Sequence, residues 1–507
     1  MSRAGLRAAA LLLALVLTLS GCGITLFDRS PSTDAAPGDA AAADASQPAP
    51  VESEKPPLTL GWSPNLGTNP YLTRSLVNWV WLPLIYESLF ELTPSYEAAP
   101  LLCTEATSSA DGRTWVLRLR EDAVFSNGVT MTAADVIYSL ELAGRSELYG
   151  DRLSCISAVT QSGQFEVTLT LTRAMGSLPL LLDVPIIRSG SAEAPLGTGA
   201  YVLMQRDGSA WLEAVSGWRG ESLGQARIAL YEVDDTDSVR DAFEFGRISL
   251  VVSDLNTAGA VNFHSNYELW SQDSSVMQFL AFSADSALFE SAAVRAALCR
   301  AIDRQTLVTE HFDGYGVAAT LPAHPRSAAY DQTLAAGYAL DAGALASAVV
   351  EAGLSGRRGS LLVCSDSSAN VDAAEAIAAN LRATGLEISV IAVGGSNYRT
   401  LLSLGSYDLA YCEARLTADF DLTPFFGGSL SAYAIQSEEA PALCAAALEN
   451  SGNFYDLHRL ILDEGLLCPL LFKTRAVMTS RGSIAGLNPA PLNIFYQPEK
   501  LTLASAE

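Results

Sequence analysis

Few side chains in this sequence have the types and spacing that catalysis or metal binding requires. The four histidines form no H-E-x-x-H motif and no pair at helical spacing, so the sequence predicts no metal site. They are His264, His311, His324 and His458. No G-x-S-x-G nucleophile elbow occurs, and the glycine-rich pieces "GTGAY" (197–201) and "FFGGS" (425–429) lack the lysine of a phosphate-binding loop. We therefore predict a protein that is not an enzyme and has no cofactor.

The residue with the clearest predicted chemistry is Cys22. Arg3 and Arg7 precede an apolar run from Ala8 to Ser20, which is typical of a secretory signal and too short to span a bilayer. The run ends in Leu19-Ser20-Gly21-Cys22, which resembles the lipobox of bacterial lipoproteins. In those proteins the cysteine thiol is acylated and becomes the mature N-terminus. The sequence thus predicts a signal peptide over 1–21 and a lipid anchor on Cys22.

Composition and charge narrow the function further. The 507 residues are 49% hydrophobic, enough for two or three domains with their own cores. Removing residues 1–21, with their two arginines, lowers the net charge from −25 to −27, which argues against nucleic acid as a partner. The seven other cysteines are widely spaced without a C-x-x-C motif, so we expect buried thiols. Cys103 and Cys155 are the pair to test for a disulfide.

A tether and a folded body follow Cys22. Residues 22–57 are rich in Ala, Pro, Ser and Asp and read as a disordered linker, so folded structure should begin near Leu58. In 115–120, Trp115, Leu117 and Leu119 alternate with Val116, Arg118 and Arg120, which is the period of a half-buried strand, and Asn127-Gly128 marks a turn. Thr132 and Asp135 have capping-box spacing and predict a helix start.

The second half of the chain alternates between strand and helix patterns. Strands are expected near 359–367, 387–393 and 407–414, and helices over 341–354, 371–386 and 397–405. Such βαβαβ alternation is typical of a parallel sheet covered by helices. Residues 294–312 predict two further helices separated at Asp303, which can cap the second.

Several of these segments together resemble the family 5 extracellular solute-binding proteins of ABC importers, which include oligopeptide, dipeptide and nickel binders. The most specific match is "DGRTWVLRLREDAVFSNGVTMTAADVIYSL" (111–140). "GTGAYVL" (197–203) is similar to the family's G-T-G-P-Y turn, and "VRAALCRAIDRQTLV" (294–308) to its helix pair. "TNPY" (68–71) and "LIYESLFEL" (84–92) resemble the family's opening strand and helix.

The resemblance implies an α/β, two-lobed periplasmic-binding-protein-like fold of the class II or cluster C type with an extra small subdomain. Lobe I would comprise 58–97, 187–272 and 476–507, the inserted subdomain 98–186, and lobe II 273–475. The protein would be an extracytoplasmic monomer, held to the bacterial cell membrane by lipid. It would close on a peptide-like or other small-molecule solute and deliver it to the permease subunits of an ABC importer.

The resemblance also implies ligand-binding residues. "ARLTADFDLTPFF" (414–426) is similar to the segment whose aspartate pairs with a peptide's α-ammonium in peptide-binding members, and Asp419 matches that aspartate. Thr417 lies in the same segment and is included in the predicted site. Leu416 stands where a tryptophan is expected, and Leu422 where an acidic residue is common.

Three further residues are predicted to contact the ligand. Arg415 and Arg74 could approach a ligand carboxylate, and Tyr71 ends the "TNPY" segment. The alternatives are a solute sensor with the same fold, a binder of nickel, haem or another non-peptide ligand, and an exported hydrolase that uses a carboxylate pair. The acidic surplus by itself fits a plain acidic surface equally well.

Overall fold

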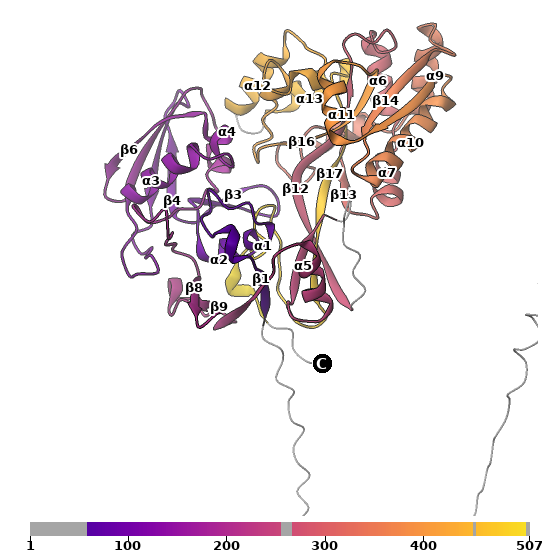
Figure 1. Ribbon diagram of the computed structural model, residues 1–507. Helices are drawn as coiled ribbons and strands as arrows, with labels where there is room; N and C mark the ends of the chain where they lie inside the picture. The colour runs from indigo at the N-terminus through magenta and orange to yellow at the C-terminus, as the bar shows by residue number, and fades with distance from the viewer. Residues whose placement is uncertain (1–57, 255–265, 450–452, 503–507) are drawn as a thin grey trace, which may run out of the picture. The chain divides into compact units, whose positions relative to one another are not determined.

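The computed structural model describes residues 58–254, 266–449 and 453–502, coloured from indigo to yellow along the chain in Figure 1. All of them belong to the unit Lys55–Glu507. Cys22, the signal segment and the predicted tether lie outside the described residues. Within the described part, no helix combines the length and apolar character needed to cross a membrane.

The first sheet joins segments that are distant in the sequence. Its strand order is β1-β10-β9-β8, with β1 parallel to β10 and the other pairs antiparallel. The strands are β1 (Thr59–Trp62), β8 (Tyr201–Arg206), β9 (Ser209–Ala214) and β10 (Arg227–Glu232). The helices of the same segments are α1 (Leu76–Trp79), α2 (Leu82–Ile85) and α5 (Thr236–Glu244).

A second sheet is formed wholly by residues 103–171, in the order β4-β5-β7-β6. Its strands are β4 (Cys103–Ser108), β5 (Thr114–Leu119), β6 (Ile156–Gly163) and β7 (Glu166–Leu171). In β5, Trp115, Leu117 and Leu119 are buried, which confirms the alternation seen in the sequence. The helix α3 (Ala133–Gly144) begins with the predicted capping box of Thr132 and Asp135 and packs on β6 and β7. A short α4 (Gly150–Leu153) follows, and β2 (Phe90–Leu92) pairs with β3 (Ala98–Pro100) just before this sheet.

The third sheet is mixed and has the order β11-β17-β12-β16-β14-β15, with β13 paired to β17. The pairs of β14 with β15 and with β16 are parallel, as the βαβαβ pattern predicts, whereas β12 pairs antiparallel with β16 and β17. The strands are β11 (Leu250–Ser253), β12 (Tyr267–Phe282), β13 (Gly316–Ala318), β14 (Arg358–Cys364), β15 (Glu387–Val393), β16 (Leu409–Arg415) and β17 (Cys468–Ser480). The helices of these segments are α6 (Ala292–Arg300), α7 (Arg304–His311), α8 (Gln332–Gly337), α9 (Ala342–Glu351), α10 (Ser368–Ala383), α11 (Gly395–Ser403), α12 (Ala440–Glu449) and α13 (Tyr455–Glu464). Asp303 caps α7, as predicted, and Asp341 caps α9, the helix expected to begin at residue 341.

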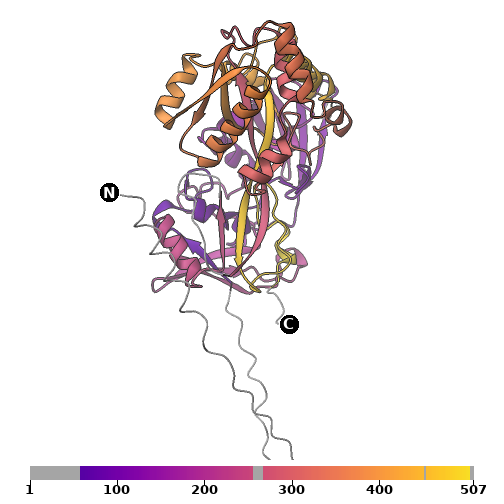
Figure 2. The ribbon, with the colours of Figure 1, turned by 90° about the vertical axis from the view of Figure 1, so that its right-hand side faces the viewer.

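The long paired strands β12 and β17 cross two of the predicted lobe boundaries. Figures 1 and 2 show them side by side, running from the region of α5 toward the region of α6 and α10. The boundaries at 272/273 and 475/476 fall inside these strands, and the β12–β17 register shifts between Asp273 and Met277. An irregular register weakens a ladder locally, so this is where the strands can bend. The division into lobes itself stays a prediction.

The "GTGAY" segment is a close crossing of two backbones. A Cβ on Gly199 would lie 2.4 Å from the carbonyl oxygen of Leu84, and one on Gly197 would lie 2.0 Å from that of Ile85. Between them the Thr198 hydroxyl donates to the buried carboxylate of Glu87 at 2.8 Å. The two glycines are therefore required by space, because any side chain would push the turn off the end of α2.

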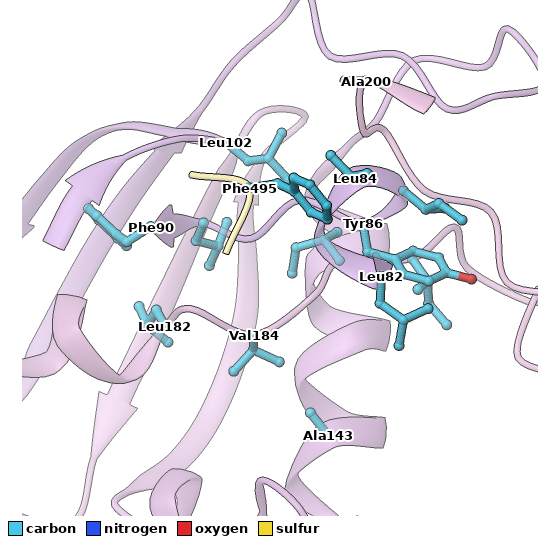
Figure 3. Packing of buried hydrophobic residues seen from close by; sticks show 14 of the residues in the cluster. Leu82, Leu84, Tyr86, Phe90, Leu102, Ala143, Leu182, Val184, Ala200 and Phe495 are labelled. Carbon is cyan, nitrogen blue, oxygen red and sulfur yellow. The ribbon is translucent and has the colours of Figure 1, made fainter. Parts of the chain in front are cut away.

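Around this crossing the first hydrophobic core brings together residues from distant parts of the chain. Figure 3 shows Leu82, Leu84 and Tyr86 of the α2 region near Phe495. The same core includes many residues of the second sheet and of α3. A core shared in this way couples the small sheet to the rest of the described unit.

One predicted strand is wrong. Residues 68–71 form a loop, in which the Asn69 side chain accepts from the Tyr71 N–H at 2.8 Å and donates to the Ala192 carbonyl at 2.7 Å. Pro70 has no N–H for a strand ladder, and asparagine's side-chain bonds favour a turn. The following segment 84–92, predicted as a helix, holds only the end of α2 and then the strand β2.

Candidate ligand-binding site

The predicted Asp419 lies in a tight turn just after β16. The Phe420 N–H donates to the Thr417 carbonyl at 3.0 Å, and Phe420 has a positive φ of 54°. The turn buries the Asp419 side chain, which is 3% exposed. Asp419 Oδ2 accepts a hydrogen bond from the Ser177 hydroxyl at 3.0 Å, across 242 residues of sequence.

The carboxyl group of Asp419 has unused hydrogen-bonding capacity. Its Oδ1 is buried without a partner among the described residues, and so is the Thr417 hydroxyl. Burial raises the pKa of the carboxyl above its usual range. The nearby Thr417 hydroxyl opposes this shift, although its geometry is too poor for a hydrogen bond, whereas the charge of Asp421 adds to it. A buried acceptor of this kind is stabilised by a donor that the ligand supplies, above all a charged one.

A cavity of about 270 Å³ adjoins this carboxyl. Its volume is close to the lower end of the range for small-molecule sites. Short stretches of four separate segments and one further aromatic residue line it: 96–98, 176–180, 327–329, 418–420 and Phe454. The wall is mostly apolar, and its polar side chains include the buried Asp419 and Ser177 and the exposed Glu97, an arrangement in which few polar contacts orient a ligand.

A larger cavity of about 470 Å³ lies next to the first and shares Gly176 with it. Its lining residues are Ser108, Ser109, Ala110, Gly112, Met175, Gly176, Ala446, Glu449 and Asn453. Its lining residues carry no buried, unpartnered polar side-chain atom within the described part of the chain. The chemistry therefore favours the smaller cavity as the site, and the larger one offers room for a ligand to extend.

Three polar contacts bridge the cavity between the segment after β7 and the segments after β16 and in α12. Arg173 pairs with Asp421 at 2.8 Å, the Gly176 N–H donates to the Leu448 carbonyl at 2.8 Å, and Ser177 donates to Asp419. Together they fasten the second sheet's segment to the third sheet's loop directly at the site.

An aromatic group behind the turn supplies part of the wall. The Tyr96 ring lies 5.4 Å from that of Phe420 and 4.7 Å from that of His324, and the Tyr96 hydroxyl is buried without a partner among the described residues. His324 faces Asp273 at 3.6 Å, and Asp273 pairs with Arg326 at 2.8 Å. Burial lowers the pKa of His324 to about 3, so the imidazole is neutral at physiological pH.

The structure separates the other predicted site residues from the cavity. Asp419 lines the smaller cavity and Thr417 lies beside it in the turn, but Arg415, Tyr71 and Arg74 line neither cavity. Tyr71 is buried in the first core, where its hydroxyl donates to the Pro185 carbonyl at 2.5 Å. Arg74 forms an exposed ion pair with Glu147.

Arg415 is exposed at the end of β16, and its charge acts on a second arginine. Burial lowers the pKa of Arg475, and the nearby Arg415 lowers it further. The two cations thus lie close enough to repel each other, and the nearby carboxylate of Asp254 partly offsets this repulsion.

Comparison with known proteins identifies the family. The family model described as "Bacterial extracellular solute-binding proteins, family 5 Middle" matches residues 97–432. The chain belongs to this family. Family 5 solute-binding proteins are extracytoplasmic and are not enzymes.

The curated relatives of this family 5 chain are distant. The "Glutathione-binding protein GsiB" of Salmonella paratyphi A is 24% identical over 283 residues, which make up 52% of this chain and 55% of that protein. The chain thus spans about half the length of the curated relatives it matches.

Solved structures confirm the two-lobed periplasmic-binding-protein fold. HbpA2 from Haemophilus parasuis has a TM-score of 0.73 at 16% identity and covers 88% of this chain and 99% of its own. NikA from Brucella suis, solved in complex with Fe(III)-EDTA, has a TM-score of 0.67 at 19% identity, with coverage of 88% and 100%. AppA from Bacillus subtilis, solved with a nonapeptide, has a TM-score of 0.59 at 18% identity, with coverage of 88% and 99%.

Sequence reasoning missed Ser177, Tyr96 and Arg173 as residues of the site. No local pattern marks them, because each is brought to Asp419 or its loop by the fold from more than two hundred residues away. The one available signal was the segment around Asp419 itself.

Proposed function

We propose that this chain captures a peptide-like solute that carries an amine, and that it delivers the solute to the permease of an ABC importer. The observation that carries the proposal is the buried Asp419 carboxyl, whose Oδ1 has no partner among the described residues and which adjoins a cavity. A ligand ammonium supplies the donors that this oxygen lacks, and its charge favours the ionised carboxylate. Ser177 orients the carboxyl through its hydrogen bond to Oδ2.

The first experiment identifies the solute. Native mass spectrometry is run on a soluble form that begins at Gly23, purified from cells, and the retained mass is resolved after denaturation. Short peptides or other amines in the released fraction support the proposal. A released solute without an amine contradicts the proposed role of Asp419. A protein that carries no solute is then titrated with peptide mixtures, and failure to bind any of them rejects the peptide-like class.

The second experiment measures the contribution of the carboxylate. Asp419→Asn keeps the shape of the side chain but removes its charge, so affinity for the identified amine should fall at least about tenfold. The matched control is Glu97→Gln, since Glu97 lines the same cavity but is exposed. Equal affinities of Asp419→Asn and the unmodified protein would sink the assignment.

The same site predicts a pH dependence with a definite sign. Because burial raises the pKa of Asp419, the carboxyl takes up a proton at a higher pH than an ordinary aspartate does. A neutral carboxyl loses the charge that attracts an ammonium, so affinity should weaken as the pH falls toward and below the raised pKa. Asp419→Asn should remove this dependence, as binding isotherms at several pH values would reveal.

Lipid anchoring through Cys22 belongs to the same proposal. Acylation of the thiol would hold the body at the bacterial cell membrane while the predicted tether gives it reach. Cys22→Ala is expected to move the protein from the membrane fraction to the soluble fraction. Retention of the variant in the membrane fraction contradicts the anchor.

The remaining predicted ligand contacts stay part of the proposal. Arg415, with Arg475 beside it, is proposed to hold a ligand carboxylate. Tyr71 and Arg74 line neither cavity and stay predicted contacts, and substitution of either should weaken binding. Deletion of the protein should abolish uptake of the identified solute in cells, whereas a pure sensor would leave uptake intact.

A further inference from the structure

Two cysteines that are far apart in the sequence meet in the second hydrophobic core. Cys299 lies near the end of α6 and is 2% exposed, and Cys468 begins β17 and is 0% exposed. The Cys299 thiol donates to the Leu467 carbonyl, immediately before Cys468, with 3.9 Å between sulfur and oxygen. The two thiol groups also interact directly with each other.

Arg304 holds the two cysteines in this arrangement. Its Nη2 donates to the Cys299 carbonyl at 2.9 Å and contacts Cys468 Sγ at 3.6 Å. Its Nε donates to the Pro469 carbonyl at 2.8 Å, so one guanidinium joins the end of α6 to the start of β17. Arg304 is 8% exposed, and its charge is therefore weakly screened by water.

The surroundings favour reaction between these two sulfurs. The contact with Cys468, together with burial, raises the pKa of the Cys299 thiol. Burial alone would raise the pKa of Cys468 as well, but the adjacent Cys299 thiol and the Arg304 guanidinium lower it below its ordinary value. Cys468 is thus the thiolate-forming partner, and the thiolate is the nucleophile in disulfide formation.

The geometry points to a disulfide between Cys299 and Cys468, formed as the chain folds outside the cytoplasm. Proteins of this family are extracytoplasmic, and disulfides persist in oxidising compartments. The pair stands apart from the other described cysteines, which make no thiol-to-thiol contact in the described part of the chain. In particular, Cys103 donates to the Glu105 carbonyl and Cys155 to the Arg152 carbonyl.

The reaction is an exchange with a disulfide reagent, either a small oxidised thiol or the disulfide of an extracytoplasmic oxidoreductase. The Cys468 thiolate attacks one sulfur of the reagent, a mixed disulfide forms, and the first reagent thiolate leaves. Cys299 then loses its proton and attacks Cys468 Sγ, which releases the second reagent thiolate. Two protein thiols become one disulfide, and the reagent disulfide becomes two thiols. Both sulfurs are buried in the folded core, so the exchange takes place when Cys299, Arg304 and Cys468 are already near one another but the core around them is not yet fully closed.

Differential labelling of the secreted protein tests the pairing. The protein is exported into an oxidising compartment, denatured, and alkylated with one reagent; it is then reduced, alkylated with a second reagent, and mapped by peptide mass spectrometry. We expect Cys299 and Cys468 to carry the second reagent and Cys103 and Cys155 to carry the first. First-reagent label on Cys299 and Cys468 would overturn the proposal.

A second measurement separates the disulfide from a merely structural contact. Reductant should lower the melting temperature of the unmodified secreted protein and of Cys103→Ser/Cys155→Ser, but should leave that of Cys299→Ala/Cys468→Ala unchanged. Equal responses of all three proteins to reductant contradict a Cys299–Cys468 disulfide. Neither measurement depends on the ligand, so failure here leaves the proposed function standing.

Discussion

Three contacts, Arg173 with Asp421, Gly176 with Leu448 and Ser177 with Asp419, form the bridge beside the candidate cavity. We predict that the ion pair between Arg173 and Asp421 controls the opening of this bridge. Its Nη2–Oδ2 distance is 2.8 Å, and Arg173 Nη1 also donates to the Thr423 hydroxyl at 3.4 Å. Asp421 is independently fixed, because its Oδ1 accepts from the Thr423 N–H at 2.7 Å. Arg173→Ala therefore removes the bridge with little rearrangement of the loop.

The size of the effect follows from the exposure of the two partners. The Arg173 side chain is 37% exposed and that of Asp421 is 15% exposed, so water screens the pair only in part. Fully exposed ion pairs contribute at most about 1 kcal/mol to stability, and a well-aligned pair that water screens only in part lies near this value. Loss of about 1 kcal/mol changes the equilibrium between bridged and open forms by about fivefold.

Hydrogen exchange at one amide measures this equilibrium without a ligand. The Gly176 N–H donates to the Leu448 carbonyl across the same bridge, at 2.8 Å, and is freed when the bridge opens. Arg173→Ala should raise the exchange rate of this amide about fivefold, and affinity for the solute should fall by a similar factor. The charge swap Arg173→Asp with Asp421→Arg should recover part of the protection.

Arg118→Ala is the matched control. Arg118 pairs with Glu105 at 3.2 Å inside the second sheet, so its loss removes an arginine and an ion pair without touching the bridge. Unchanged exchange at Gly176 in Arg173→Ala, or an equal increase in Arg118→Ala, would refute the assignment of the bridge to this pair.

Two further predictions concern stability. Gly199→Ala places a Cβ 2.4 Å from the Leu84 carbonyl oxygen and 2.6 Å from that of Ile85, so the free energy of unfolding measured in denaturant should fall by about 3 kcal/mol. The control Gly144→Ala, which has open space around the Cβ, should leave the free energy of unfolding nearly unchanged. Equal values for the two variants would contradict the steric argument. Burial lowers the pKa of His458 to about 3 from an unfolded value of 6.5, so the unfolded chain binds more protons and stability should decline as pH falls from about 6.5 toward 3. His458→Phe should flatten this slope in unfolding curves recorded across that range, and an unaltered slope would show that other groups cause it.

Much of the fold could be predicted because its signals are local. The capping box of Thr132 and Asp135, the alternation of Trp115 and its neighbours, and the strand–helix alternation after 341 each depend on residues within one turn or one strand. The wrong strand at 68–71 has the opposite cause. There the side-chain bonds of Asn69 and the missing N–H of Pro70 decide the backbone conformation against the strand expected from the resemblance.

The pairing of distant residues could not be predicted from spacing. The sequence put forward Cys103 and Cys155 as a pair to test, whereas the fold brings Cys299 and Cys468 together through α6 and β17. In the same way, Ser177 reaches Asp419 only because the segment after β7 packs against the loop after β16. Contacts of this kind depend on tertiary packing, and a single sequence carries no local mark of them.

The folded site explains the two leucines that stand where peptide-binding members of the family are expected to have a tryptophan and an acidic residue. Leu416 and Leu422 are 5% and 1% exposed, so both leucines anchor the two ends of the turn in the third core rather than face a ligand. The aromatic surface of the cavity comes instead from Phe420 in the turn itself and from Tyr96 and Phe454, which belong to other segments. A tryptophan at 416 is therefore not needed to line the cavity. The turn still provides the buried carboxylate of Asp419, the group that would pair with a positively charged ligand. This distribution of roles favours a small amine-bearing solute over one recognised mainly by stacking on residue 416.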